Sequence, residues 1–248
     1  MDFHLVLLML IVLVAFSVGA ATGFGNAIIA LTLALNFFPI DFLIPVIVVL
    51  SIVTSLYLAL RHRSGIDVPL LRKKILPYTL VGIPIGLIIF RTVRTENLKL
   101  GFGAFVLILS VFELIRTVRQ DEHESPRPLG PFRSRLWLLG GGIIQGLWVS
   151  GGPLIAYWAN RNITNKRQFR STLSSLWLLL NTILLVGHVA MGRFTWKSAK
   201  MSAILLPFVL GGVVIGERLH DVLPEKSFRI AVYTILIFAG ASVIITAG

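Results

Sequence analysis

The stretch GGPLIA at residues 151–156 and the related stretch GNAIIA at residues 25–30 interrupt the two longest apolar blocks of this chain, 136–160 and 3–37. The second of these blocks would form a straight helix about 52 Å long, whereas a bilayer core of ~30 Å needs about 20 residues. Glycine and proline disfavour a helix by about 1 and 3 kcal/mol relative to alanine. Each stretch therefore predicts a break within an apolar segment.

The rest of the chain is apolar to a degree that soluble domains do not reach. Of its 248 residues, 56% are hydrophobic and 14% are charged, and the mean hydropathy is +0.87. In soluble domains about 45–50% of the residues are apolar and about 25% are charged. Six further apolar blocks each have the length of one helical crossing: 42–60, 75–90, 100–118, 171–190, 201–216 and 230–246. We therefore predict an all-α integral membrane protein embedded in the lipid bilayer, and not a soluble enzyme or a disordered chain.

The excess of basic over acidic residues does not indicate nucleic acid as a partner. The net charge is +12, and all 23 lysines and arginines lie between the apolar blocks or at their ends, as topology signals do. The chain has no cysteine, which excludes disulfides and cysteine-ligated metals. No basic residue precedes the first apolar block, so we interpret that block as part of the structure and not as a signal peptide.

The chain contains an internal repeat. The two interrupted stretches align with each other, as do Asn36 with Asn162, residues 54–55 with 181–182, and residues 82–86 with 212–216. We predict two homologous repeats of transmembrane helices, 1–118 and 134–248, joined by a polar linker at 119–133. A doubled unit with glycine- and proline-interrupted segments at matching places is typical of a secondary transporter.

The distribution of basic residues predicts how the repeats are oriented. If each interrupted block forms a re-entrant hairpin or crosses twice, 17 basic residues fall on one side of the membrane and 6 on the other. If each block crosses once, the division is 10 and 13. The positive-inside rule favours the first arrangement, which makes the repeats inverted and the linker cytoplasmic. A polar turn between two ordinary spans remains the alternative, so six spans with hairpins, eight spans and ten spans all stay open.

Residues 23–26 (GFGN), residues 146–154 (GLWVSGGPL) and the twofold repeat together resemble the sulfite exporter TauE/SafE family. The resemblance covers nearly the whole chain. It implies a multi-span transporter of the cytoplasmic membrane that exports sulfite or small organosulfonate anions. The chain departs from the usual glycine-rich pattern of the family at Phe24 and Asn26, and again at Val149 and Ser150.

The breaks are also candidates for anion binding. Helix N-termini offer unpaired backbone N–H groups and about half a unit of positive charge. Two short helices that begin near Asn26 and Pro153 would direct these groups at one central site. The alternative is that the small residues only allow tight helix packing. The candidate substrate-binding residues are Gly25, Asn26, Gln145, Ser150, Gly151, Gly152, Pro153, Thr54, Ser55, Asn181 and Thr182.

Several polar residues have two interpretations. Thr54, Ser55, Asn181 and Thr182 either line the site or form hydrogen bonds between helices. His188 is either a proton carrier for coupling or an ordinary interfacial histidine. Arg61 and Arg170 either line an anion vestibule or act as topology signals. The acids of 100–118 and 201–217, Glu113 and Glu217, are expected to pair with Arg116 and Arg218.

These observations favour a secondary transporter for small inorganic or organosulfur anions that works by alternating access, with proton coupling as an option. An anion channel and a non-transporting assembly subunit are the alternatives. The five histidines lie in five separate regions, and we find no motif for catalysis, metal or cofactor binding. The sequence therefore indicates neither an enzyme nor a cofactor, and it does not determine the oligomeric state.

Overall fold

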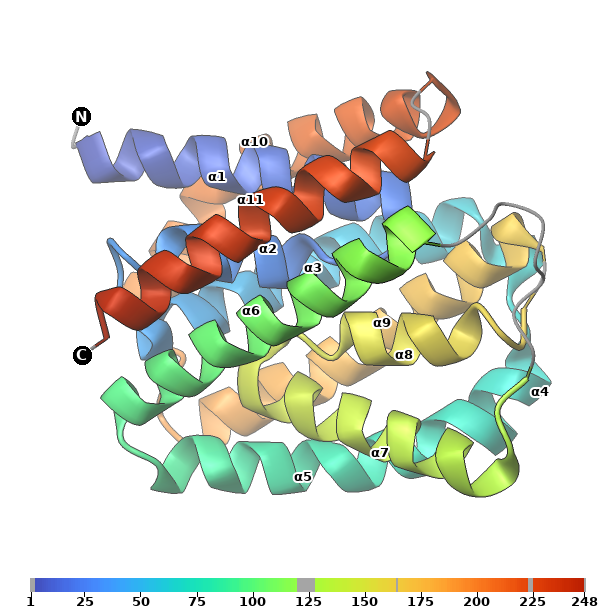
Figure 1. Ribbon diagram of the computed structural model, residues 1–248. Helices are drawn as coiled ribbons and strands as arrows, with labels where there is room; N and C mark the ends of the chain where they lie inside the picture. The colour runs from blue at the N-terminus through green and yellow to red at the C-terminus, as the bar shows by residue number, and fades with distance from the viewer. Residues whose placement is uncertain (1–2, 120–127, 164, 223–224, 248) are drawn as a thin grey trace.

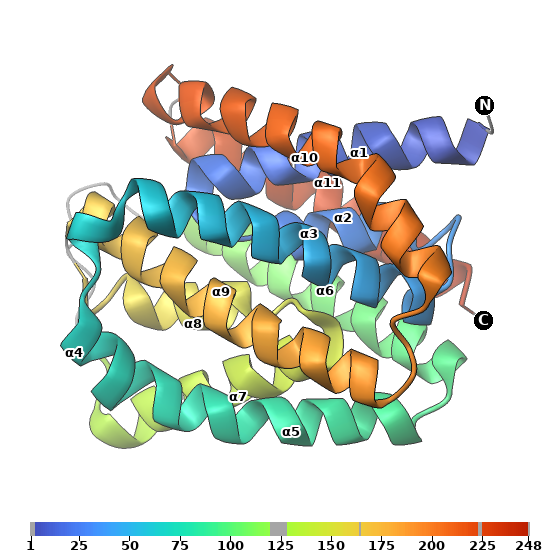
Figure 2. The same ribbon diagram turned by 180° about the vertical axis from the view of Figure 1, so that it is seen from behind.

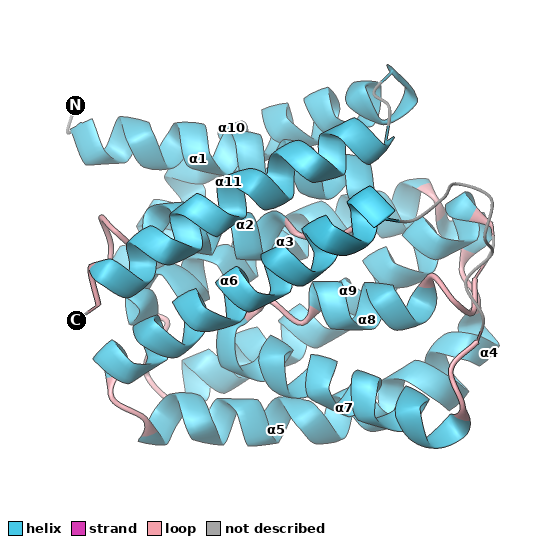
Figure 3. Ribbon diagram, in the orientation of Figure 1, coloured by secondary structure: helices cyan, strands magenta, loops and turns pink. Residues whose placement is uncertain are grey.

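The computed structural model describes residues 3–119, 128–163, 165–222 and 225–247 (Figure 1). In these ranges every regular element is helical and no strand occurs (Figure 3). The all-helical fold predicted from the apolar blocks is thus confirmed. The interruptions predicted at 25–30 and 151–156 coincide with helix ends.

The first half of the chain contains a long helix, a short helix and three further long helices. They are α1 (Phe3–Thr22), α2 (Asn26–Ala34), α3 (Ile40–Arg61), α5 (Leu76–Thr92) and α6 (Thr95–Arg119). A 3-10 turn (Arg63–Gly65), the short α4 (Val68–Leu70) and a π-helical turn (Leu71–Ile75) connect α3 to α5. The last two run directly into α5, so that Val68–Thr92 forms one continuous helical segment.

The second half contains the same order of long and short helices. They are α7 (Pro131–Trp148), α8 (Gly152–Ala159), α9 (Lys166–Ala190), α10 (Trp196–Val222) and α11 (Glu225–Ile245). Of the predicted linker 119–133, residues 120–127 lie outside the described residues. The boundaries of the two repeats therefore stay predictions.

Among the described residues, six helices are long and apolar enough to cross a bilayer: Phe3–Thr22, Ile40–Arg61, Val68–Thr92, Thr95–Arg119, Arg167–Ala190 and Trp196–Arg218. A shorter apolar helix covers Ile230–Ile245. The short helices α2 and α8 lie inside the bundle, and most of their residues are buried.

Helices of one half pack closely against helices of the other half at glycine residues. Gly82 of α5 faces the backbone of α7, where an added Cβ would lie only 2.5 Å from the carbonyl oxygen of Leu139. Gly212 of α10 faces α1 in the same manner, and its Cβ would lie 2.7 Å from the carbonyl oxygen of Leu13. Gly86 and Gly216 repeat these contacts one turn later, against the carbonyl oxygens of Ile143 and Ser17. Each half therefore packs its third long helix against the first helix of the other half, because glycine lets two helix backbones approach closely.

The two broken segments point in opposite directions. In Figure 1, α1 begins at the left end of the molecule and α7 at the right end, and each short helix turns back toward the end from which its segment started. Helices α3 and α9 lie side by side between the two broken segments (Figure 2). The C-terminal ends of α3, α6 and α10 and the start of α9 share the right end of Figure 1.

Candidate functional site

The first break, between α1 and α2, depends on glycine conformation. Gly23 and Gly25 have φ angles of 85° and 94°, in the left-handed region where a side chain is costly. The indole Nε1 of Trp177, on α9, donates a hydrogen bond of 3.0 Å to the carbonyl oxygen of Gly23. The hydroxyl of Thr22 donates one of 2.6 Å to the carbonyl of Phe24. A side chain from the second half of the chain thus holds the first break in place.

The second break, between α7 and α8, is held by a side-chain amide of its own helix. The Oε1 atom of Gln145 accepts a hydrogen bond of 3.0 Å from the backbone N–H of Gly151. Its Nε2 atom donates one of 2.9 Å to Oδ1 of Asn181, on α9. The left-handed residue here is Val149, with a φ of 57°. A residue of this kind at positive φ is uncommon and stores strain, so the surrounding contacts fix this turn.

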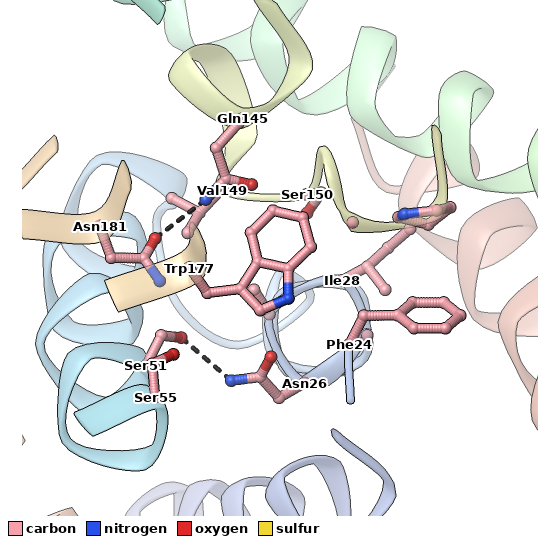
Figure 4. Close-up of a pocket in the computed structure, with 14 residues that line it drawn as sticks. Phe24, Asn26, Ile28, Ser51, Ser55, Gln145, Val149, Ser150, Trp177 and Asn181 are labelled. Carbon is pink, nitrogen blue, oxygen red and sulfur yellow. Dashed lines mark hydrogen bonds between the residues drawn. The ribbon is translucent and has the colours of Figure 1, made fainter. Parts of the chain in front are cut away.

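The two breaks meet at one cavity (Figure 4). About 340 Å³ of space in this region is not filled by protein atoms, and this volume includes open solvent at the mouth of the cavity. Both breaks contribute, together with Ser51 and Ser55 of α3 and Trp177 and Asn181 of α9. None of the lining residues is charged. They are Phe24, Gly25, Asn26, Ala27, Ile28, Ser51, Ser55, Gln145, Val149, Ser150, Gly152, Pro153, Trp177 and Asn181.

Polar side chains from both halves converge on this cavity. Nδ2 of Asn26 donates a hydrogen bond of 3.0 Å to the hydroxyl of Ser51, and Figure 4 shows this pair opposite the Gln145–Asn181 pair. The hydroxyl of Ser150 donates one of 2.9 Å to the carbonyl of Trp148. The N-terminal turns of α2 and α8 contribute lining residues, so two helix N-termini lie at the same space.

Most of the predicted binding residues lie at this cavity. Those that line it are Gly25, Asn26, Ser55, Gln145, Ser150, Gly152, Pro153 and Asn181. Gly151 is not among the lining residues, but its N–H donates a hydrogen bond to the lining residue Gln145. Thr54 and Thr182 are not among the lining residues, and their hydroxyls donate hydrogen bonds to backbone carbonyls of their own helices, those of Leu50 and Leu178.

Sequence reasoning did not select Ser51 and Trp177 as binding residues. Each lies four residues before a selected residue, Ser55 or Asn181, and so on the same face of its helix. Helical periodicity applied to the selected residues would have found both. Phe24 was noted only as a departure from the family pattern, yet it lines this cavity and also two neighbouring ones.

A cluster of charges lies at the end of the molecule where α3 and α10 end. The Oε1 atom of Glu217 lies 3.4 Å from Nε of Arg61, 3.6 Å from Nε2 of His62 and 3.7 Å from Nη2 of Arg170. Its Oε2 atom accepts a hydrogen bond of 3.2 Å from the hydroxyl of Tyr57. The expected pairing of Glu217 with its neighbour Arg218 is therefore wrong, because tertiary packing brings it cations from α3 and α9.

Two effects lower the pKa of His62 below its usual value of 6.5. The larger is burial of the imidazole, and the second is the nearby positive charge of Arg170. The imidazole is therefore neutral at pH 7 and adds no charge to the cluster.

The expected ion pair of Glu113 and Arg116 is present on α6, with Nη1 of Arg116 3.2 Å from Oε1 of Glu113.

His188 lies away from the cavity. Its side chain is fully buried, and its ring meets the ring of Phe90 edge-on with centroids 5.5 Å apart. His188 is therefore covered by α5 and does not reach the cavity, and its two interpretations, as a proton carrier or as an ordinary interfacial histidine, both stay open. Among the described residues, no group of three or more histidine, cysteine, aspartate or glutamate side chains is placed to hold a metal ion.

The helices, the two breaks and the cavity between them define a multi-pass membrane protein with a polar, uncharged cavity lined by both breaks. A sequence model of the family described as "Sulfite exporter TauE/SafE" matches residues 8–243. The chain belongs to this family, whose description is that of membrane exporters and not of enzymes. No curated protein and no solved structure matches the chain significantly.

Proposed function

We propose that the protein is a secondary transporter that moves small anions, sulfite or organosulfonates, out of the cytoplasm across the cytoplasmic membrane. The observation that carries this proposal is the convergence of two short-helix N-termini and three side-chain amides on one buried, uncharged cavity. Family membership supports transport and gives sulfite as the first substrate to test.

The cavity has the chemistry that a small oxyanion requires. Helix N-termini supply backbone N–H groups and positive potential without a formal charge. The amides of Asn26 and Gln145 each carry two N–H groups, and the hydrogen bonds to Ser51 and Asn181 use one of them. The second N–H of each amide is available to an anion in the cavity. Without a lysine or arginine in the lining, binding stays weak enough for release.

The opposed directions of the two broken segments support inverted repeats with re-entrant short helices. Because glycine contacts join α1 to α10 and α5 to α7, each rigid pair combines helices from both halves of the chain. We propose that these mixed pairs, and not the two sequence repeats, are the bodies that rock around the cavity during alternating access. Proton coupling of this movement is part of the proposal.

The test is sulfite flux in proteoliposomes, with and without an imposed proton gradient, for the wild type, Asn181→Leu and Thr182→Val. Thr182→Val is the matched control for Asn181→Leu, since the two residues are neighbours on α9 and only Asn181 lines the cavity. We expect gradient-dependent flux in the wild type and in Thr182→Val. In Asn181→Leu we expect a loss of about tenfold or more, because one buried partner of the amide network disappears.

Three outcomes contradict the proposal. If wild-type liposomes carry neither sulfite nor any member of a panel of organosulfonates and other small anions, the transporter assignment fails. If folded Asn181→Leu transports as fast as the wild type, the cavity is not the binding site. Flux that follows the membrane potential alone would identify the channel alternative.

A further inference from the structure

The carboxylate of Glu217 is bound as a substrate anion would be bound. It contacts two guanidinium groups, those of Arg61 and Arg170, and the phenol of Tyr57. Its side chain is only 15% exposed and that of Arg170 only 13%, so water screens their interaction weakly. The hydroxyl of Tyr57 also accepts a 2.6 Å hydrogen bond from Nη1 of Arg61, which orients that guanidinium.

Arg170 connects this cluster to the central cavity. It lies seven residues before Trp177 and eleven before Asn181, and these spacings place all three on one face of α9. Its side chain passes the first break, where a Cβ added to Gly23 would lie 3.6 Å from Cγ of Arg170. Arg170 therefore lies about two helical turns from Trp177 and about three from Asn181, the cavity-lining residues of α9.

The cluster also joins one of the two proposed rocking bodies, the α1–α10 pair, to helices α3 and α9, which lie between the two broken segments. Glu217 ends the part of α10 that is packed through Gly212 and Gly216 onto α1. Its cationic partners come from α3 and α9, which pack against each other. At this end of the molecule the carboxylate thus adds ion pairs to the direct packing of α10 on α3 and links the α1–α10 pair to α9 as well.

We infer that Arg61 and Arg170 form an anion-entry site and that Glu217 occupies it as a built-in competitor that keeps this end closed. This inference rests on the proposed function. A small oxyanion presents the same acceptor oxygens to a guanidinium as a carboxylate does. Because two anions in one partly buried site repel each other, an arriving substrate displaces Glu217, breaks the tie and opens a path along Arg170 to the cavity.

The experiment uses the fact that the chain has no cysteine. Ser55→Cys places one small thiol in the cavity lining. Its reaction with a membrane-impermeant thiol reagent is timed from each side of the membrane, alone and combined with Glu217→Gln. The matched control is Glu96→Gln, which removes an exposed acid paired at 3.8 Å with Arg94 near the start of α6.

We expect Glu217→Gln to accelerate labelling about tenfold from the side of the cluster and not from the other side, because the closed state loses its ion pairs. Glu96→Gln leaves the rate unchanged. Arg170→Gln breaks the same tie from the other partner, so it also accelerates labelling. The two variants differ in sulfite binding, which Arg170→Gln weakens and Glu217→Gln preserves or strengthens.

Labelling that neither Glu217→Gln nor Arg170→Gln accelerates would overturn the inference, whatever the flux measurements show. Suppose that labelling is accelerated but the protein transports none of the tested anions. That result would support the role of Glu217 in closing this end and would contradict the proposed transport function. Equal loss of sulfite binding in both variants would show that Glu217 supports the site structurally and does not compete for it.

Discussion

The two helix breaks align in sequence and meet at one cavity, yet different forces hold them. At the first break the backbone itself turns left-handed at Gly23 and Gly25, and space is open around Gly25, where an added Cβ would meet no atom within 4 Å. At the second break the aligned Gly151 has an ordinary φ of −67°. An added Cβ there would collide with the carbonyl oxygen of Gly141.

One aligned glycine is therefore required for its conformation and the other for its small size. The left-handed turn of the second break falls on Val149, two residues earlier, and hydrogen bonds of Gln145 hold it. A repeat in sequence thus preserves the position of a break while its physical cause changes. The predictions below separate the two causes, beginning with the largest expected effect.

Gly151→Ala should be the most damaging single substitution at the breaks. Its methyl group collides with backbone atoms of α7, which cannot rotate away as a side chain can. We expect a destabilisation at or above the upper end of the ~1–3 kcal/mol typical of overpacking. Thermal unfolding in detergent measures it, and a melting temperature equal to that of the wild type would contradict the close packing of α7 and α8.

Gln145→Leu should rank second. It keeps the approximate size of the side chain but leaves the N–H of Gly151 and the amide oxygen of Asn181 without their partner. Each unsatisfied buried group costs about 1–3 kcal/mol. We expect both lower thermal stability and loss of anion flux. Gln145→Glu should restore the bond to Gly151 but not flux, because a carboxylate beside the cavity repels an anion.

Gly25→Ala should cost less, about 1–2 kcal/mol, the penalty for a left-handed alanine. Since the space beside Gly25 is open, a larger residue that tolerates this conformation should do better than alanine. Asparagine is such a residue. Thermal unfolding should therefore place Gly25→Asn above Gly25→Ala, and the reverse order would indicate that size and not conformation selects glycine at this break.

Trp177→Phe removes the hydrogen bond to the carbonyl of Gly23 and keeps most of the aromatic packing. We expect a destabilisation of about 1 kcal/mol, the typical net value of one hydrogen bond. Hydrogen exchange of amides in residues 23–29 should accelerate, while exchange around the second break stays unchanged. Equal acceleration at both breaks would show that Trp177 acts on the bundle as a whole.

The smallest effect concerns pH at the charge cluster beside the first break. Because the pKa of His62 is lowered in the folded protein, the unfolded chain binds more protons below pH ~6.5. The stability that neutral His62 contributes is therefore fully present above that pH and is lost as the pH falls from there through the lowered pKa of the folded protein. The melting temperature should decrease less between pH 7.5 and 5.5 in His62→Gln than in the wild type. Identical decreases would assign the acid sensitivity to other groups.

Sequence reasoning located the breaks because glycine and proline act locally, on the backbone that carries them. It located most of the cavity for the same reason, since Asn26 and Ser150 lie within two residues of a break. It also selected Thr54 and Thr182, for their matching places in the two repeats, and the structure places them beside lining residues, with hydroxyls bonded to their own helices. Adjacent helical residues face different directions, and the alignment alone did not say which one faces inward.

The sequence by itself determined the class of protein, the apolar helices and the two interrupted segments, because hydropathy and helix propensity are summed over neighbouring residues. Only the tertiary structure decided which partners meet across the chain. It paired Glu217 with Arg61 and Arg170 rather than with Arg218, buried His188 under α5, and packed α5 on α7 and α10 on α1. These contacts depend on how distant helices cross, and no local property of the residues specifies that.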